Sequence, residues 1–145
     1  MEAIRNYTAH AYRQINSGLL KGQQPEGAAE LAAALSALPA AAGTCFRTIW
    51  VDELDAYAAQ VKASKALCFP AFTSTSRSEA TARRFNGNVL FRIEGRTGRD
   101  IARYSDAPAE AETLFTMGTT FVVKSVKAKK IAGRVFSLEI SLIEK

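Results

Sequence analysis

The fold class of this chain is indicated by residues 136–142, which read Phe-Ser-Leu-Glu-Ile-Ser-Leu. Apolar and polar side chains alternate with a period of two, which is typical of a β-strand that buries one face and exposes the other. The dipeptide Ala132-Gly133 precedes this segment and predicts a hairpin to a strand that begins near Phe121. The C-terminal third is therefore predicted to be β-sheet.

The first third has a different periodicity. Apolar residues recur there at steps of three and four, the stripe of an amphipathic helix: Ile4, Tyr7, Ala11, Tyr12, Ile15 and Leu19. Gly22 ends this helix, and a second helix is expected over residues 26–38, before Pro39. Because helices come first and mostly antiparallel strands follow, the expected class is α+β, with N-terminal helices packed on two β-sheets that flank a cleft. No strand–glycine loop–helix phosphate motif occurs, which argues against a doubly wound nucleotide fold.

The middle of the chain alternates between short strands and short helices. Asp52 is expected to be the N-cap of a helix that continues to about residue 62. Ser76 is a candidate cap for a second helix, and Pro70 interrupts one of the strands. The expected elements are strands over residues 44–50, 66–75 and 89–94, a helix over 78–85 and a turn over 86–88.

Composition limits the functional classes. With 145 residues, 48% hydrophobic and 23% charged, the chain is expected to form one domain, residues 1–145. No apolar run approaches the roughly 18–20 residues needed to span a bilayer.

His10 is the only histidine, so a metal site of the His/Cys kind is not expected. Cys45 and Cys68 lie in apolar runs and are interpreted as buried free thiols, with a disulfide left open. The net charge of +5 favours an anionic partner, which could be a dinucleotide, a nucleic acid or an acidic protein surface.

Arg47 lies in a strand whose two faces are both apolar. A guanidinium placed there loses hydration, at a cost of several kcal/mol unless an anion meets it. The anion could be an internal Asp or Glu. It could also be a ligand phosphate, which the planar donor fork of arginine fits well.

Two further motifs carry polar groups that suit chemistry. Ser74-Thr75-Ser76 ends a strand, where hydroxyls either mark an exposed edge or fix the position of a carboxylate. In extended backbone Glu110 and Glu112 would lie on one face about 6.5 Å apart. They follow a loop and lead into apolar Leu114, so one of them is expected to be half-buried. Paired carboxylates suit glycosidic-bond chemistry, in which one steadies an oxocarbenium-like centre and the other handles the nucleophile.

Together and in this order, these motifs resemble the arginine-directed mono-ADP-ribosyltransferases, a group that includes many bacterial toxins and effectors. The family pattern is an Arg on an early strand, a Ser-Thr-Ser strand, and a Glu-x-Glu reached by a short recognition loop. Residues 8–16 resemble the first family helix and residues 118–123 resemble the strand after the Glu-x-Glu. The resemblance covers about residues 5–125. Many relatives have Gly directly after the strand Arg, whereas this chain has Thr48.

The resemblance implies a role for each matching residue. Arg47 would hold a phosphate of NAD⁺, the co-substrate, and the backbone of Thr48 would bond the nicotinamide amide. Ser74 would orient the carboxylate of Glu112, and Glu112 would stabilise the cationic ribosyl centre. Glu110 would receive the acceptor guanidinium and help to remove its proton. No metal is implied.

The segment 77–88 resembles the family loop that wraps the phosphates, which would make Arg83 or Arg84 a secondary phosphate contact. The same segment is equally typical of a solvated helix.

The implied function is transfer of ADP-ribose from NAD⁺ to an exposed arginine of a target protein. The chain would be a secreted or delivered toxin or effector, monomeric, without a membrane partner, and paired with an immunity protein if the target is bacterial. Two alternatives remain open: RNA modification or NAD⁺ hydrolysis by the same site, and a degenerate binding module. The net charge and a lysine cluster mildly favour the RNA acceptor, although a basic strand or hairpin is more often a solvated face: Lys124, Lys127, Lys129 and Lys130.

Overall fold

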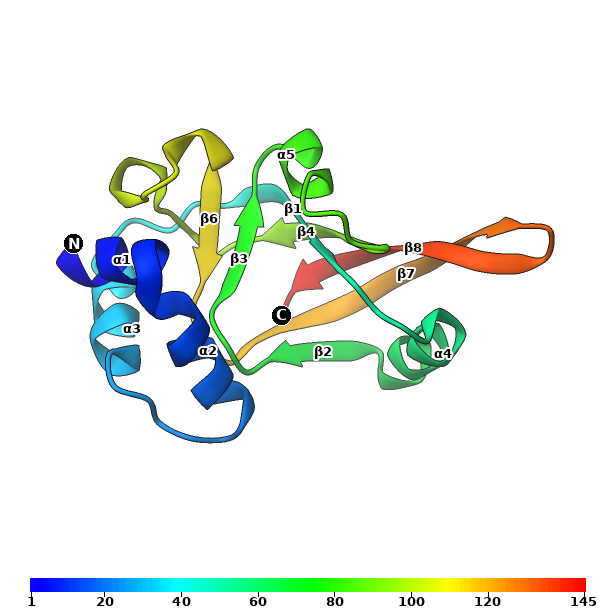
Figure 1. The fold of residues 1–145 in the computed structure, drawn as a ribbon, viewed down its shortest axis with the longest axis horizontal. Helices are drawn as coiled ribbons and strands as arrows, with labels where there is room; N and C mark the ends of the chain where they lie inside the picture. The colour runs from blue at the N-terminus through cyan, green and yellow to red at the C-terminus, as the bar shows by residue number, and fades with distance from the viewer.

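The computed structural model describes all residues from Met1 to Lys145, and its strands form one continuous eight-stranded sheet (Figure 1). The order across the sheet is β2-β7-β8-β4-β1-β3-β6-β5. The strands are β1 (Gly43–Ile49), β2 (Ala66–Phe69), β3 (Thr73–Ser76), β4 (Val89–Gly95), β5 (Arg99–Asp100), β6 (Glu112–Phe115), β7 (Thr119–Ile131) and β8 (Arg134–Glu144).

The sheet has two halves that meet at β1. This strand pairs with β4 along all seven of its residues but with β3 only through Phe46 and Ser76. All neighbouring strands are antiparallel except β4 and β8, which are parallel. The expected α+β class is therefore confirmed. The two expected sheets correspond to these halves, which one strand pair joins into a single sheet.

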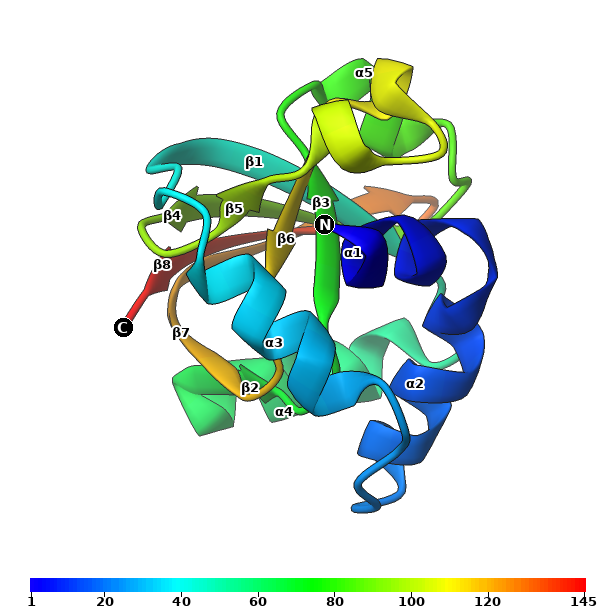
Figure 2. The ribbon, with the colours of Figure 1, turned by 90° about the vertical axis from the view of Figure 1, so that its left-hand side faces the viewer.

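Helices from the N-terminal third cover the half that contains β3 and β6 (Figure 2). These are α1 (Glu2–Asn6), the π-helical turn η1 (Tyr7–Ala11), α2 (Tyr12–Leu20) and α3 (Ala28–Ser36). Their apolar stripe forms one core cluster with the sheet: Ile4, Tyr7, Ile15, Ala28, Leu31, Leu35, Phe72, Ile101 and Leu114. The predicted amphipathic helix is thus present, with a π-helical turn inside it.

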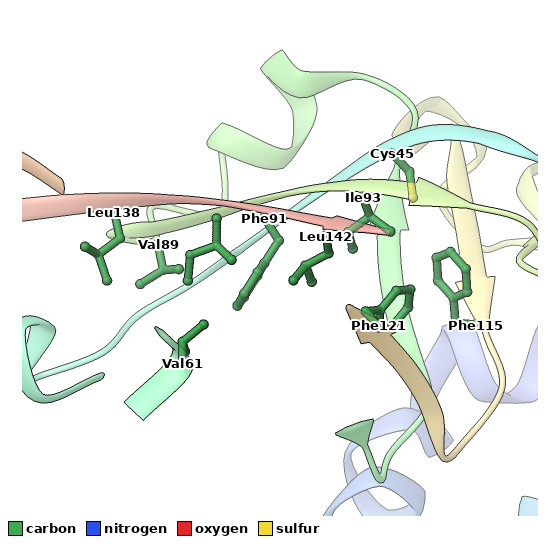
Figure 3. Close-up of a cluster of buried hydrophobic side chains, with 10 residues drawn as sticks. Cys45, Val61, Val89, Phe91, Ile93, Phe115, Phe121, Leu138 and Leu142 are labelled. Atoms are coloured by element: carbon green, nitrogen blue, oxygen red, sulfur yellow. The ribbon is translucent and has the colours of Figure 1, made fainter. Parts of the chain in front are cut away.

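A second core cluster lies under the other half of the sheet (Figure 3). Alternate residues of β4 and β8 point into it, and Val61 of α4 (Leu54–Ser64) closes it from below. Phe115 and Phe121 meet edge to face, with ring centroids 5.2 Å apart. These contacts confirm that the alternating segments after residues 89 and 136 are half-buried strands.

Both predicted helix caps are wrong. The N-cap of α4 is Glu53, and Asp52 instead accepts a hydrogen bond from the indole of Trp50 at 3.0 Å. The short helix α5 (Glu79–Arg83) is capped by Ser78, whose side chain accepts from a backbone N–H three residues later. The Ser76 hydroxyl donates to the Glu110 carbonyl in the loop before β6 at 2.7 Å and accepts from the Ser78 N–H at 3.0 Å, so it contacts the capping residue without being the cap.

The cysteines and the hairpin turn complete the comparison with the sequence. Cys45 is a buried free thiol as expected, but Cys68 is exposed, and no disulfide joins them. Ala132 (φ 51°) and Gly133 (φ 78°) both have positive φ, as a two-residue hairpin turn requires.

Two 3₁₀ turns, η2 (Ala102–Tyr104) and η3 (Pro108–Glu110), precede β6. No helix of the structure is long and apolar enough to cross a membrane.

Candidate active site

A cavity of about 550 Å³ opens between the N-terminal helices, the strands β1 and β3, the helix α5 and the loop before β6. This volume is within the range of small-molecule sites, roughly 300–1,000 Å³. Five residues singled out from the sequence line it: Arg47, Thr48, Ser74, Glu110 and Glu112.

Arg47 projects from β1 and meets no carboxylate within ion-pair distance. Its Nη1 donates to the backbone carbonyl of Ser74 at 2.9 Å. Burial lowers the pKa of the guanidinium, and nearby Tyr7 and Glu112 act in the opposite direction. The sequence left open whether an internal carboxylate pairs with Arg47, and the structure shows a backbone carbonyl in that place. The cation therefore keeps donors free for an anion in the cavity.

Ser74 and Glu112 form a pair across β3 and β6, in which Glu112 is buried and Ser74 is half-buried. The two strands are antiparallel, with Ser76 opposite Glu112 and Ser74 opposite Leu114. From this register the Ser74 hydroxyl donates to Oε2 of Glu112 at 2.5 Å. Glu112 is only 8% exposed, more deeply buried than the half-burial expected from the sequence. The hydrogen bond fixes its carboxylate in the cavity wall.

The pKa of Glu112 lies above its ordinary value. Burial is the main cause, and the nearby charge of Glu110 acts in the same direction. The hydrogen bond from Ser74 and the charge of Arg47 lower it, but burial outweighs them. A carboxylate held in this way attracts a positive charge that develops beside it more strongly than a solvated one would.

Glu110 reaches the same cavity by a route that the sequence did not predict. The segment is not extended, because Glu110 ends the turn η3 and Ala111 adopts a left-handed conformation (φ 49°, ψ 50°). Two hydrogen bonds hold this turn: the Ser76 hydroxyl donates to the Glu110 carbonyl at 2.7 Å, and the Arg77 N–H donates to the Ala111 carbonyl at 3.1 Å. Both carboxylates still line one cavity.

Thr48 uses its hydroxyl to tie β1 to α5. It donates to the Ala82 carbonyl at 2.7 Å, and Thr48 also lines the cavity. Arg83 and Arg84 are not among the lining residues. Arg83 forms ion pairs with Glu79 at 2.9 Å and with Glu139 at 3.4 Å. The phosphate contact assigned to Arg83 or Arg84 stays a prediction.

The cavity also contains residues of the predicted first helix to which the sequence analysis assigned no role in the site. Asn16 donates to the hydroxyl of Tyr7 at 2.8 Å and accepts from the backbone N–H of Phe72 at 3.1 Å, so it joins the first helix to the start of β3. Burial raises the pKa of Tyr7 to about 12. Tyr12 lines the cavity as well. Residues five apart align in a π-helix, so the turn η1 brings Tyr7 and Tyr12 toward one face.

The rim on the other side is formed by the loop before β6. Ser105, Asp106 and Ala107 line the cavity there, next to Glu110. The Asp106 N–H donates to the Thr8 hydroxyl at 3.2 Å, which ties this loop to the first helix. The five-residue spacing of the two tyrosines and the acidic Asp106 could have been noticed in the sequence. That these residues line the same cavity depends on the π-helical turn and on the path of the loop, which the sequence did not predict.

The arrangement of Arg47, the Ser-Thr-Ser strand and the two glutamates around one cavity agrees with a comparison against protein families. The family model described as NAD:arginine ADP-ribosyltransferase matches residues 28–141. The chain belongs to this family. Its members are transferases whose family name states both the donor and the acceptor.

Individual relatives agree with this assignment. The protein Mav of Mycobacterium avium (strain 104), named as an NAD⁺–arginine ADP-ribosyltransferase, is 33% identical over 153 aligned positions that include the whole chain. The chain spans only 18% of the length of that relative.

Solved structures show the same fold. ADP-ribosyltransferase HopU1 of Pseudomonas syringae pv. Tomato DC3000 superimposes with a TM-score of 0.85 at 23% identity, covering 99% of this chain and 75% of HopU1. Exoenzyme S of Pseudomonas aeruginosa, in complex with human 14-3-3 protein beta and bound to Carba-NAD, has a TM-score of 0.78 at 21% identity, covering 98% and 71%.

Proposed function

We propose that this chain is a single catalytic domain, residues 1–145, that transfers ADP-ribose from NAD⁺ to an arginine side chain of a target protein and releases nicotinamide. The observation that carries the proposal is the Ser74–Glu112 pair, which shares a cavity with a guanidinium that has no carboxylate partner. One cavity thus offers a cation for a phosphate and a fixed carboxylate for a developing positive charge.

Arg47, Thr48 and Ser74 prepare the donor side of the reaction. Arg47 binds a phosphate through donors that the Ser74 carbonyl leaves free. The backbone of Thr48 bonds the nicotinamide amide, while its hydroxyl keeps α5 against β1. The Ser74 hydroxyl holds the carboxylate of Glu112 in one orientation. These contacts keep the bond to be broken next to a buried negative charge.

Glu112 and Glu110 divide the chemistry. As the bond between the ribose carbon and the nicotinamide nitrogen breaks, its electron pair leaves with nicotinamide and Glu112 stabilises the cationic ribosyl centre. A guanidinium nitrogen of the acceptor then bonds to the same carbon, and the proton it loses passes to Glu110. Glu110 is half-buried at the end of the exposed turn η3 and lines the cavity, where an acceptor side chain can reach it.

The relatives support a proposal for the biological setting. HopU1 and Exoenzyme S are bacterial proteins of the same fold, and Mav is several times longer than this chain. We infer that the domain acts as a toxin or effector that is secreted or delivered into a target cell. Its partner there is a protein with an exposed arginine, and a producer whose own proteins are at risk needs an immunity protein that blocks the cavity.

Two glutamine substitutions test the proposal. Glu112→Gln keeps the shape and hydrogen bonding of the side chain but removes its charge, so both ADP-ribosylation of agmatine and NAD⁺ hydrolysis should collapse. Glu110→Gln should abolish agmatine modification and leave slow NAD⁺ hydrolysis, because water needs no carboxylate to hold it. Agmatine is a suitable probe because it presents a free guanidinium.

The ratio of the two activities in each variant decides the outcome. Equal loss of both activities in Glu110→Gln would refute the division of labour. Retained agmatine modification in that variant would refute the role of Glu110 in receiving the acceptor guanidinium and would remove that residue as the basis for arginine specificity. Hydrolysis without agmatine modification in the unmodified chain would identify an NAD⁺ glycohydrolase.

A further inference from the structure

The net charge of this chain resides on one hairpin. Residues 124–137, here named the basic arm, span the end of β7, the turn and the start of β8, and they contain no Asp or Glu. The whole chain has 19 basic and 14 acidic residues, so the rest of it carries equal numbers of each and no net charge. The five cations of the arm are Lys124, Lys127, Lys129, Lys130 and Arg134.

These cations are exposed and largely unpaired. All five side chains belong to exposed residues, and only Lys129 meets a carboxylate, that of Glu139 at 3.2 Å. Two large apolar side chains accompany them on the arm: Ile131 is 65% exposed and Phe136 is 48% exposed. The arm projects beyond the body of the molecule (Figure 1). It therefore presents positive charge and apolar area together.

One edge of the arm has no strand beside it. β2 pairs with β7 only as far as Val122, and the last backbone hydrogen bond on that side joins the Val123 N–H to the Lys65 carbonyl at 2.9 Å. β8 occupies the opposite edge along the whole hairpin. From residue 124 to residue 131, the outer backbone groups of β7 are thus open. An open edge accepts an extended peptide as an additional strand.

One face of the arm lines a small depression that is separate from the main cavity but shares one residue with it. The depression, of about 90 Å³, is lined by Lys129 and Ser137 from the arm and by Thr48, which also lines the main cavity. A partner strand on the outer edge of β7 would be separated from β1 by β7, β8 and β4, so it would bind the arm without entering the candidate active site.

We propose that the basic arm binds an extended acidic segment of the acceptor protein as an additional strand on the outer edge of β7. Backbone hydrogen bonds supply the pairing, the lysines supply charge complementarity, and Ile131 and Phe136 supply apolar contact. Lysines along the edge oppose pairing with a second copy of the same strand, which selects for an acidic partner. A polynucleotide would use the charges alone and leave the open backbone edge unpaired.

The proposal rests on the proposed function only in naming the acceptor as the partner. Binding is measured by the fluorescence anisotropy of a short labelled peptide of alternating Glu and Val, at low and at high salt. A second peptide has the same charge but proline at alternate positions, so it cannot pair fully as a strand. A single-stranded uridine oligonucleotide of the same length is the third probe.

Matched triple variants separate the arm from overall charge. The arm variant combines Lys124→Glu, Lys127→Glu and Lys130→Glu, which leaves the ion pair of Lys129 intact. The control combines Arg5→Glu, Lys21→Glu and Lys145→Glu, exposed positions outside the arm and outside the cavity lining, with the same change in net charge.

The Glu-Val peptide should bind in a salt-dependent way, and the arm variant should weaken that binding about tenfold or more while the control changes it less than about twofold. Both variants should modify agmatine at the unmodified rate. Absence of binding, equal weakening by the control, or equal binding of the proline peptide would overturn strand addition. Tighter binding of the oligonucleotide would overturn the choice of a protein partner. If the chain without substitutions binds the peptide but does not modify agmatine, the proposed function is refuted and strand addition is still supported.

Discussion

Glu112 holds its carboxylate in the cavity wall with only 8% of the residue exposed, and replacing it with glutamine should stabilise the fold at neutral pH. Burial raises the pKa of this carboxyl group, with Glu110 adding to the effect and Ser74 and Arg47 only partly opposing it. The ionised form is thus less favourable in the folded chain than in the unfolded chain. Glutamine has the size of the neutral acid and no charge, so it removes this cost.

The pH range of the effect follows from the direction of the shift. Below the ordinary value of 4.5, Glu112 is protonated in both states and should match glutamine. As the pH rises from 4.5 towards the raised pKa, the carboxyl group loses its proton in the unfolded chain but not in the folded chain, so the folded state loses stability relative to the glutamine variant; the loss is complete above the raised pKa. Each unit of elevation corresponds to about 1.4 kcal/mol at such a pH. Since 1 kcal/mol moves the Tm of a domain of this size by roughly 3–4 °C, each unit of elevation should raise the Tm of Glu112→Gln above that of the unsubstituted chain by roughly 4–6 °C.

Thermal unfolding of Glu112→Gln and of the unmodified chain, below about pH 4 and again at neutral pH, measures this gain. Glu26→Gln serves as the matched control, because Glu26 is exposed and the same chemical change there should leave Tm nearly unchanged at both pH values. A fall in Tm of Glu112→Gln at neutral pH would show that the ionised carboxylate stabilises the fold. An equal rise at both pH values would show that its charge is not the cause.

Arg47→Ala should weaken NAD⁺ affinity by about 1.5–3 kcal/mol while changing Tm little, because its only partner in the chain is the Ser74 carbonyl. Calorimetric titration and thermal unfolding test this together, and unchanged affinity with a large loss of Tm would make Arg47 a structural residue. Ser74→Ala should lower turnover about ten- to a hundredfold, as loss of a group that orients a reactive one does. It should also move the acid limb of the pH–rate profile to higher pH, because the Ser74 hydrogen bond lowers the pKa of Glu112. Full activity of Ser74→Ala, with the acid limb of the pH–rate profile unchanged, would show that Ser74 is part of the strand but does not position Glu112.

Local periodicity carried most of the fold prediction. Alternation around Leu138 and the helical stripe around Ile15 are short-range patterns, and each survives in the structure because one face of each element packs in a core. The caps were misassigned because several neighbouring residues could serve: Asp52 stands beside Glu53, and Ser76 stands two residues from Ser78. Burial of Cys68 was predicted from an apolar run, but β2 is an edge strand of the sheet.

By itself, the sequence determined the α+β class and the residue types that the site needs, because periodicity and motif order can be identified without knowing where the chain turns. Only the tertiary structure decided how those residues meet. Arg47 contacts a residue 27 positions away, and Ser74 one 38 positions away, through strand register that no local pattern specifies. The left-handed Ala111 that brings Glu110 to the cavity depends on hydrogen bonds from β3 and the residue after it. These contacts depend on the packing of the whole sheet, since each of them joins segments that are far apart along the chain.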